Sequence, residues 1–297
     1  MMLKNMARST SPHVSESLSK NAAIFREIDE PDEDTDIGLR LARIKELDYL
    51  TANPFLMALR AHSEDSEFAL VLEIVESFLV RRLICGLSTR GYGTLFIDMM
   101  NAIVDQRGTS PPRDRAIAFL LRSDAEASRW PNDAEFGKAW TEEPLYERLA
   151  RPRLRFVLRA LEEHMRTSSG LTESFTVPAR LEIEHVMPQS GETNWPLPLG
   201  EPLNGKAAQT RRNEIHTIGN LTLLTKKLNG TLSNAAWSAD VDDVPSKQKT
   251  IKAYSLMMLS KDIVDRPRWD EDQIRKRRLA LFAQACQIWP APPAVMN

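Results

Sequence analysis

The chain has 297 residues, of which 39 are lysine or arginine and 41 are aspartate or glutamate, so its formal charge is −2. This length predicts about two domains, and a hydrophobic fraction of 42% excludes wholesale disorder. A signal-peptide core and an apolar run long enough for a membrane helix are both absent from the sequence, and two distant cysteines exclude a disulfide framework. We therefore expect a cytoplasmic protein with no membrane partner.

The near-neutral total charge conceals a local excess of acids. Residues 27–36 read EIDEPDEDTD and hold seven acids without a base, so the remaining 34 acids face 39 bases. The acidic run is typical of a solvated linker, with a segment that competes with DNA for a basic surface as the alternative. Residues 1–35 are expected to form a disordered or linker tail, and the mildly basic remainder allows weak contact with nucleic acid.

Helical spacing dominates residues 36–170. Apolar residues from Phe68 to Ile84 recur at three- and four-residue intervals, which predicts a helix over residues 66–83. Similar spacing predicts helices around 95–103 and 117–121, and another after Pro152, because proline suits the first helical turn. Helical spacing returns over 245–297, with a last helix from Ile274 to Trp289. The expected fold is mainly α: a helical domain over 36–170 with C-terminal helices that pack back on it.

Residues 171–244 differ, with proline and glycine punctuation and short β-like runs. LEIEHVMPQ (181–189) predicts a strand that ends near Glu184 and His185, because Pro188 cannot donate a ladder hydrogen bond. IHTIGNLTLLTKKLN (215–229) predicts a second apolar run, interrupted by Asn220, and then a short helix that carries Asn229. We expect this segment to be a small ββα insert in the helical fold.

These polar residues suit a metal-dependent phosphodiesterase. His185 is a candidate general base for deprotonating water, with a pKa near neutrality. The Glu184 carboxylate and the Asn229 amide oxygen are hard ligands, which favour Mg²⁺ or Mn²⁺ over zinc. Asn220 would order the loop that bears His185, because an asparagine side chain can bond backbone groups.

The same stretch resembles the HNH (His-Me finger, ββα-metal) nuclease domain at the C-terminus of GmrSD-type restriction proteins. The resemblance lies in Ile183-Glu184-His185 with Pro188-Gln189, then residues 216–224 (HTIGNLTLL), then Leu228-Asn229. It extends to ESFLVRR (76–82), to WPND (130–133) with Phe136, and to the last helix, and so covers residues 36–290 in all.

The resemblance implies a divalent-metal DNA endonuclease that acts as the effector half of an anti-phage restriction protein. Because one such site cuts one strand, we expect a monomer to nick DNA. It implies catalytic roles for His185 and Asn220 and metal-ligand roles for Glu184 and Asn229. In such proteins the domain follows a ParB-like nucleotide-hydrolysing domain, which we expect to be missing from this chain. Family substrates include glucosylated hydroxymethylcytosine DNA and phosphorothioated DNA, the latter with SspE-like proteins.

Other residues leave alternatives open. His216 is either a second catalytic group or a structural residue at the hairpin. A non-catalytic DNA-binding or partner-docking module that retains an HNH-like fold is the alternative function. The basic residues that are expected to contact DNA phosphates, or else to be plain surface charges, are Arg211, Arg212, Lys226, Lys227, Arg275, Lys276, Arg277 and Arg278.

Overall fold

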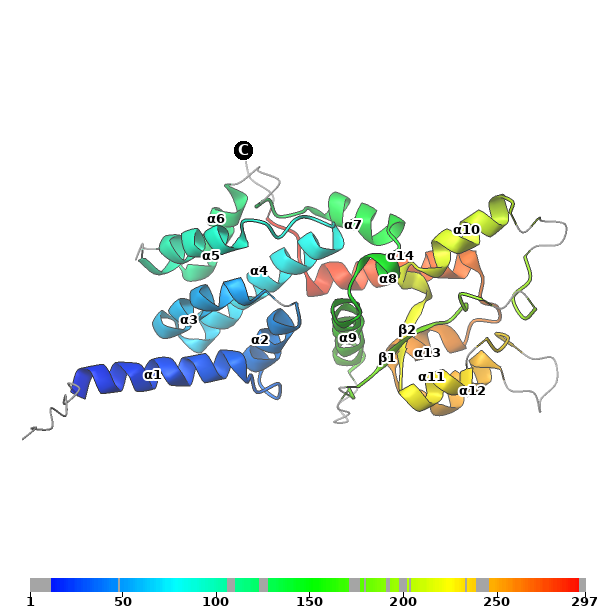
Figure 1. Ribbon diagram of the computed structural model, residues 1–297, viewed down its shortest axis with the longest axis horizontal. Helices are drawn as coiled ribbons and strands as arrows, with labels where there is room; N and C mark the ends of the chain where they lie inside the picture. The colour runs from blue at the N-terminus through cyan, green and yellow to red at the C-terminus, as the bar shows by residue number, and fades with distance from the viewer. Residues whose placement is uncertain are drawn as a thin grey trace, which may run out of the picture. The chain divides into compact units, whose positions relative to one another are not determined.

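The computed structural model describes residues 12–47, 49–105, 110–122, 128–170, 177–178, 180–190, 193–197, 202, 204–232, 234–238 and 246–293. Its internal contacts divide the chain into two compact units. The first unit takes in residues 1–76, 88–130 and 293–297, and the second takes in 77–87 and 131–292. The predicted fold class is confirmed, because helices dominate and a two-stranded antiparallel sheet lies in the C-terminal half (Figure 1).

All regular elements among the described residues of the first unit are helices or helical turns. Its helices are α1 (Pro12–Asp29), α2 (Asp36–Glu46), α3 (Asn53–His62), the first part of α4 (Asp65–Ile84), α5 (Tyr92–Met100) and α6 (Pro112–Leu121), with short turns η1 (Leu50–Ala52) and η2 (Asn101–Asp105). Thr35 begins α2 by accepting a hydrogen bond from the Gly38 N–H. Phe55 and Phe96 stack in the core, with ring centroids 5.9 Å apart. The helices expected over 66–83, 95–103 and 117–121 are thus α4, α5 and α6.

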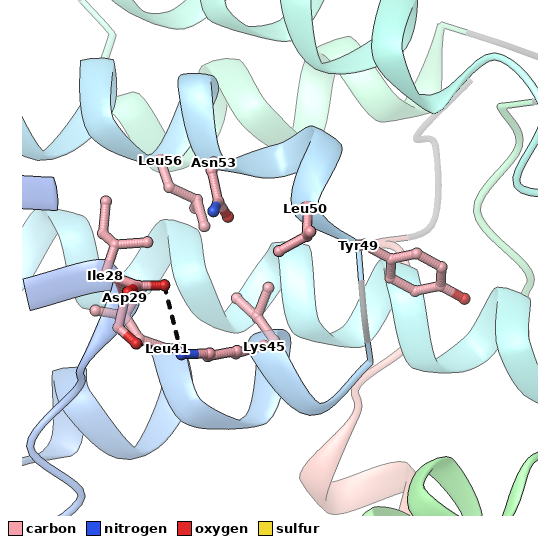
Figure 2. Close-up of a pocket in the computed structure, with 9 residues that line it drawn as sticks. Ile28, Asp29, Leu41, Lys45, Tyr49, Leu50, Asn53 and Leu56 are labelled. Atoms are coloured by element: carbon pink, nitrogen blue, oxygen red, sulfur yellow. Dashed lines mark hydrogen bonds and ion pairs between the residues drawn. The ribbon is translucent and has the colours of Figure 1, made fainter. Parts of the chain in front are cut away.

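The tail predicted over residues 1–35 is corrected at α1. Ile24 and Ile28 of α1 are buried, because the helix packs on α2 and α3. Two of its acids are also paired: the Glu27 carboxylate lies 3.0 Å from the Arg60 guanidinium, and Figure 2 shows Asp29 facing Lys45, with 3.5 Å between carboxylate oxygen and ammonium nitrogen. Part of the acidic run therefore forms ion pairs that hold α1 to α2 and α3, which a count of charges does not reveal.

The second unit contains the segment with the conspicuous polar residues. Beyond the last residues of α4, its elements are α7 (Asp133–Glu142), α8 (Leu145–Arg148), α9 (Arg151–Ser168), β1 (Glu182–His185), α10 (Lys206–Ile215), η3 (Ile218–Asn220), β2 (Leu221–Leu224), α11 (Lys226–Leu232), α12 (Lys247–Tyr254), α13 (Met258–Val264) and α14 (Glu271–Ile288). Helix α14 packs on α7, α9 and α10, and α13 packs on α9. The C-terminal helices do pack back on the preceding helices, as expected. None of the helices described in either unit is long and apolar enough to cross a bilayer.

Strands β1 and β2 pair antiparallel, with Glu184 opposite Thr222 and His185 opposite Leu221. Helix α11 follows β2 and contacts β1, which completes a ββα unit. Apolar side chains from β2, from the residues that follow β1 and from α10 to α14 form one core beneath it, including Met187, Leu224 and Trp269. The sheet is short, so this core fixes its place in the fold.

Two buried charged side chains connect the helices around the sheet. Glu162 of α9 accepts hydrogen bonds at 2.8 Å from the N–H groups of Met258 and Leu259, where α13 begins. Arg277 of α14 donates to the carbonyl oxygens of Gly219 (2.9 Å) and Leu221 (2.7 Å) at the start of β2. Because both side chains are fully buried, these bonds fix α9, α13 and α14 around the ββα unit.

Replacing Gly219 by alanine should destabilise the protein. The new Cβ would overlap the Ile274 carbonyl oxygen and lie 2.9 Å from Cβ of Arg278, both on α14. We expect a loss of about 1–3 kcal/mol in the free energy of unfolding, measured by urea denaturation. Gly230→Ala is the matched control, because a Cβ there meets nothing within 4 Å and alanine favours the helix. An unchanged midpoint for Gly219→Ala would contradict the close packing of η3 on α14.

Candidate metal-dependent nuclease site

The side chain of Asn220 fixes the bend that follows β1. Its Oδ1 accepts hydrogen bonds from the Met187 N–H (2.8 Å) and the Trp269 indole N–H (3.0 Å). Its Nδ2 donates to the carbonyl oxygens of Met187 (2.8 Å) and Ile215 (3.0 Å). Its own carbonyl oxygen accepts from the Val186 N–H at 2.9 Å. Asn220 is fully buried, so one satisfied amide joins β1, α10 and the segment before α14.

His185 ends β1 and lies against two other rings. Its centroid is 4.2 Å from that of Tyr146 and 5.3 Å from that of His216, both in edge-to-face arrangements. The imidazole is 5% exposed, and its Nδ1 lies 3.2 Å from the side-chain nitrogen of Gln189. Nε2 is buried and has no hydrogen-bond partner among the residues that the structure describes. A buried polar atom of this kind is a natural contact for a bound water or ligand.

The electrostatic surroundings of His185 disfavour its charged form. Burial lowers its pKa from 6.5 to about 3, and the positive charges of His216, Lys247 and Arg151 act in the same direction. The near-neutral pKa expected from the sequence is thereby corrected for the free protein. The imidazole is neutral at pH 7 and can accept a proton. It does so at Nε2 only when Nδ1 carries the ring hydrogen and the Gln189 amide presents its oxygen there.

Glu184 is paired with Lys247, a residue that the sequence did not single out. The Lys247 ammonium lies 2.5 Å from Oε1 of Glu184 and donates to the His185 carbonyl oxygen at 2.9 Å. Burial raises the pKa of Glu184 and lowers that of Lys247, and the charge of each partner opposes the other's shift. Because Lys247 is fully buried at the start of α12, the pair holds the end of β1 to that helix.

Asn229 contacts a different carboxylate from the one expected. Its amide nitrogen donates to Oε2 of Glu182 at 3.0 Å. Glu182 and Glu184 are two residues apart on β1, so their side chains leave the same face of the strand, whereas His185 leaves the other. The sequence-based choice of Glu184 and Asn229 as ligands overlooked Glu182, although strand alternation alone would have placed it beside Glu184.

These residues offer oxygen donors that suit a hard cation. Two carboxylates and the oxygen of the Asn229 amide lie on β1 and α11, and Mg²⁺ or Mn²⁺ prefers such ligands. Lys247 bonds one carboxylate oxygen of Glu184, which leaves the second oxygen for a cation. Within the described part of the chain, no three His, Cys, Asp or Glu side chains gather closely enough to form a metal site by themselves. The fit therefore depends on the amide and on water to complete the coordination.

The structure separates the predicted DNA-binding cations into buried and exposed groups. Arg277 is fully buried and bonds Asp262 at 2.9 Å, so its assignment to a DNA surface is corrected. Arg278 and Arg275 bond the Glu214 carboxylate at 3.0 and 3.2 Å, and Arg211 bonds Glu271 at 2.6 Å. The exposed members of the set are Arg212, Lys226, Lys227 and Lys276.

His216 stands beside His185 rather than apart from it. Its Nε2 lies 3.3 Å from the Glu147 carboxylate, and its carbonyl oxygen accepts the Tyr146 N–H at 3.1 Å. Its Nδ1 is buried without a partner among the described residues. The backbone contact suits a structural role, and the ring nitrogen without a described partner suits a catalytic one. Tyr146 lay outside every sequence motif, and its place here depends on tertiary packing of α8.

Asn220→Ala should destabilise the protein far more than Asn229→Ala. The first change leaves the Met187 and Trp269 N–H groups and two carbonyl oxygens without their buried partner, which we expect to cost about 3 kcal/mol or more of unfolding free energy. The second removes one partly exposed hydrogen bond and should cost about 1 kcal/mol or less. Thermal denaturation compares the two variants, and equal losses would contradict the role of Asn220 as the buried junction.

His185 should make the protein less stable in acid. Its pKa of about 3 in the folded protein lies below the ordinary 6.5, so the unfolded chain binds more protons between these values. The stability contributed by neutral His185 is then complete above pH 6.5 and is lost as the pH falls towards 3, by at most about 1.4 kcal/mol per pH unit. His185→Gln should flatten this slope in urea denaturation, whereas parallel acid losses in both proteins would contradict the burial of a neutral imidazole.

Comparison with known families agrees with this geometry. Residues 130–284 match the C-terminal domain family of the GmrSD restriction endonucleases, a range that contains β1, β2, α11 and every site residue described above. A search of curated proteins finds no match. Because the matched range is more than half of the 297 residues, the chain belongs to the GmrSD restriction endonuclease C-terminal domain family, which implies a restriction nuclease that acts on DNA.

Proposed function

We propose that the chain is a divalent-metal-dependent HNH endonuclease that hydrolyses a phosphodiester bond of DNA. The observation that carries this proposal is the ββα unit: His185 ends β1 directly after Glu184, its buried Nε2 has no partner among the described residues, and Asn220 fixes the bend that follows. Family membership supports a restriction nuclease, and the ββα unit supports the finer assignment.

His185 takes the part of the general base. Its neutral imidazole accepts a proton from a water molecule, whose oxygen attacks the phosphorus. The bond from phosphorus to the leaving sugar oxygen breaks, and that oxygen takes a proton from solvent. The products are one end with a phosphate monoester and one with a hydroxyl. A DNA phosphate close to the imidazole favours its charged form, which raises the pKa of His185 above its value in the free protein.

Glu184 and Asn229 would hold Mg²⁺ or Mn²⁺, with Glu182 orienting the Asn229 amide through their 3.0 Å hydrogen bond. When bound, the cation supplies positive charge for the phosphate oxygens and the leaving oxygen. Lys247 keeps the Glu184 side chain in place. One such site cuts one strand, so a single protomer should nick. Target choice would belong to a ParB-like nucleotide-hydrolysing partner domain, in keeping with the resemblance of the motifs.

Incubation of supercoiled plasmid with Mg²⁺ or Mn²⁺ tests the proposal. The wild-type chain should produce nicked circles, EDTA should abolish the reaction, and His185→Ala should slow it at least about 100-fold, because removal of a general base costs that much. His164→Ala is the matched control: this histidine lies in the same unit, bonds Gln287 at 3.0 Å and has no place in the site. Equal rates for wild type and His185→Ala would overturn the assignment. Metal-independent DNA binding without cleavage would favour the non-catalytic module.

A further inference from the structure

The junction of α8 and α9 places an arginine beside the two histidines. The Tyr146 ring lies 4.2 Å from His185 and 5.7 Å from His216 between ring centroids. The guanidinium carbon of Arg151 lies 3.4 Å from the centroid of the same tyrosine. Cation and ring at this distance attract each other. Tyr146 therefore holds the Arg151 guanidinium near the imidazole of His185, which the proposed reaction uses.

Arg151 is held by the backbone, which leaves its charge unneutralised. One guanidinium nitrogen donates to the carbonyl oxygens of Tyr146 and Leu149. Among the described residues no carboxylate pairs with Arg151, whereas its neighbour Arg148 lies 3.8 Å from Glu143. Arg151 is also exposed. It is thus a fixed, accessible cation at the edge of a buried site, unlike the paired Arg211, Arg275 and Arg278.

Two polar atoms in the same cluster lack partners. Nε2 of His185 and Nδ1 of His216 are both buried without a hydrogen bond among the residues described, and the two rings are 5.3 Å apart. Burying such atoms without partners costs free energy, which indicates that water or a polar ligand meets them. The cation beside them, which pairs with no carboxylate among the described residues, favours an anionic ligand. An arginine fork suits phosphate oxygens in particular.

We propose that Arg151, seated on Tyr146, binds a non-bridging oxygen of the DNA phosphate beside His185. This inference rests on the proposed function and deepens it, because it names the residue that brings the phosphodiester to the base. The contact is to the DNA backbone, so it positions DNA of any sequence in the same way. Tyr146 is then a positioning residue: its N–H bonds the His216 carbonyl oxygen at 3.1 Å, and its ring fixes the cation.

Arg151→Gln, Arg151→Lys and the control Lys252→Gln test the inference in the full chain. Lys252 is exposed in the same unit and pairs with Asp265 at 3.2 Å. Binding of a short fluorescein-labelled duplex in EDTA is measured against salt, and plasmid nicking is measured in Mn²⁺. Loss of one phosphate contact should reduce the slope of log Kd against log salt by about 0.9. Arg151→Gln should also lower kcat/KM about 100-fold, with partial recovery in Arg151→Lys, which keeps the charge but not the fork.

Each outcome separates this inference from the proposed function. If the wild type nicks plasmid while Arg151→Gln keeps both its kcat/KM and its salt slope, the inference fails and the nuclease stands. If no metal supports nicking but Arg151→Gln still reduces the slope of log Kd against log salt, the phosphate contact stands and the nuclease fails. Equal effects of Arg151→Gln and Lys252→Gln would overturn the inference, because general surface charge would then explain both. A wild type that neither binds nor nicks would overturn both proposals.

Discussion

The buried amide of Asn220 sets the position of His185, and the candidate site depends on it. An asparagine side chain has two donor hydrogens and one acceptor oxygen, and here all of them meet buried partners on three separate segments. The loop after β1 has no other regular structure to hold it, since β1 ends at His185. A side chain that satisfies both the N–H and the carbonyl oxygen of Met187 replaces the missing ladder.

Two buried cationic side chains near Asn220 connect segments that are distant in the sequence. Lys247 and Arg277 are fully buried, and each combines one carboxylate with backbone carbonyl oxygens. Removing a partner from such a pair would leave an uncompensated charge in the interior. Their burial also lowers the number of positive charges available to DNA below the count of basic residues. The remaining exposed cations suit weak, salt-sensitive contact with the DNA backbone.

The sequence predicts those parts of the site that depend on residues close together along the chain. Pro188 and the apolar alternation predict the end of β1, and a short helix that carries Asn229 is expected after the second apolar run, where α11 lies. Helix α10 was not expected, because its sequence KAAQTRRNEI is mostly polar and shows little helical periodicity. The composition around α1 predicts a linker, because its acids meet Lys45 and Arg60 only in the folded chain.

Other features required the tertiary structure. Lys247 meets Glu184 across 63 residues, and nothing near either residue signals that contact. Likewise, four consecutive basic residues on α14 are equivalent in the sequence, and helix packing alone decides that Arg277 turns inward. Tyr146 and Arg151 reach His185 for the same reason. The motif thus indicated the candidate residues for metal and water, while the second unit as a whole determines what surrounds them.

The position of a bound cation is the most direct test of the proposed metal site at Glu184 and Asn229. Crystals of the full chain soaked with Mn²⁺ and measured at the manganese absorption edge would locate the ion by its anomalous signal. We expect a peak in contact with the Glu184 carboxylate and the Asn229 amide oxygen, and we expect Glu184→Ala to abolish it. A fully occupied peak elsewhere in the second unit, unchanged in that variant, would contradict the assignment of these residues as the metal ligands.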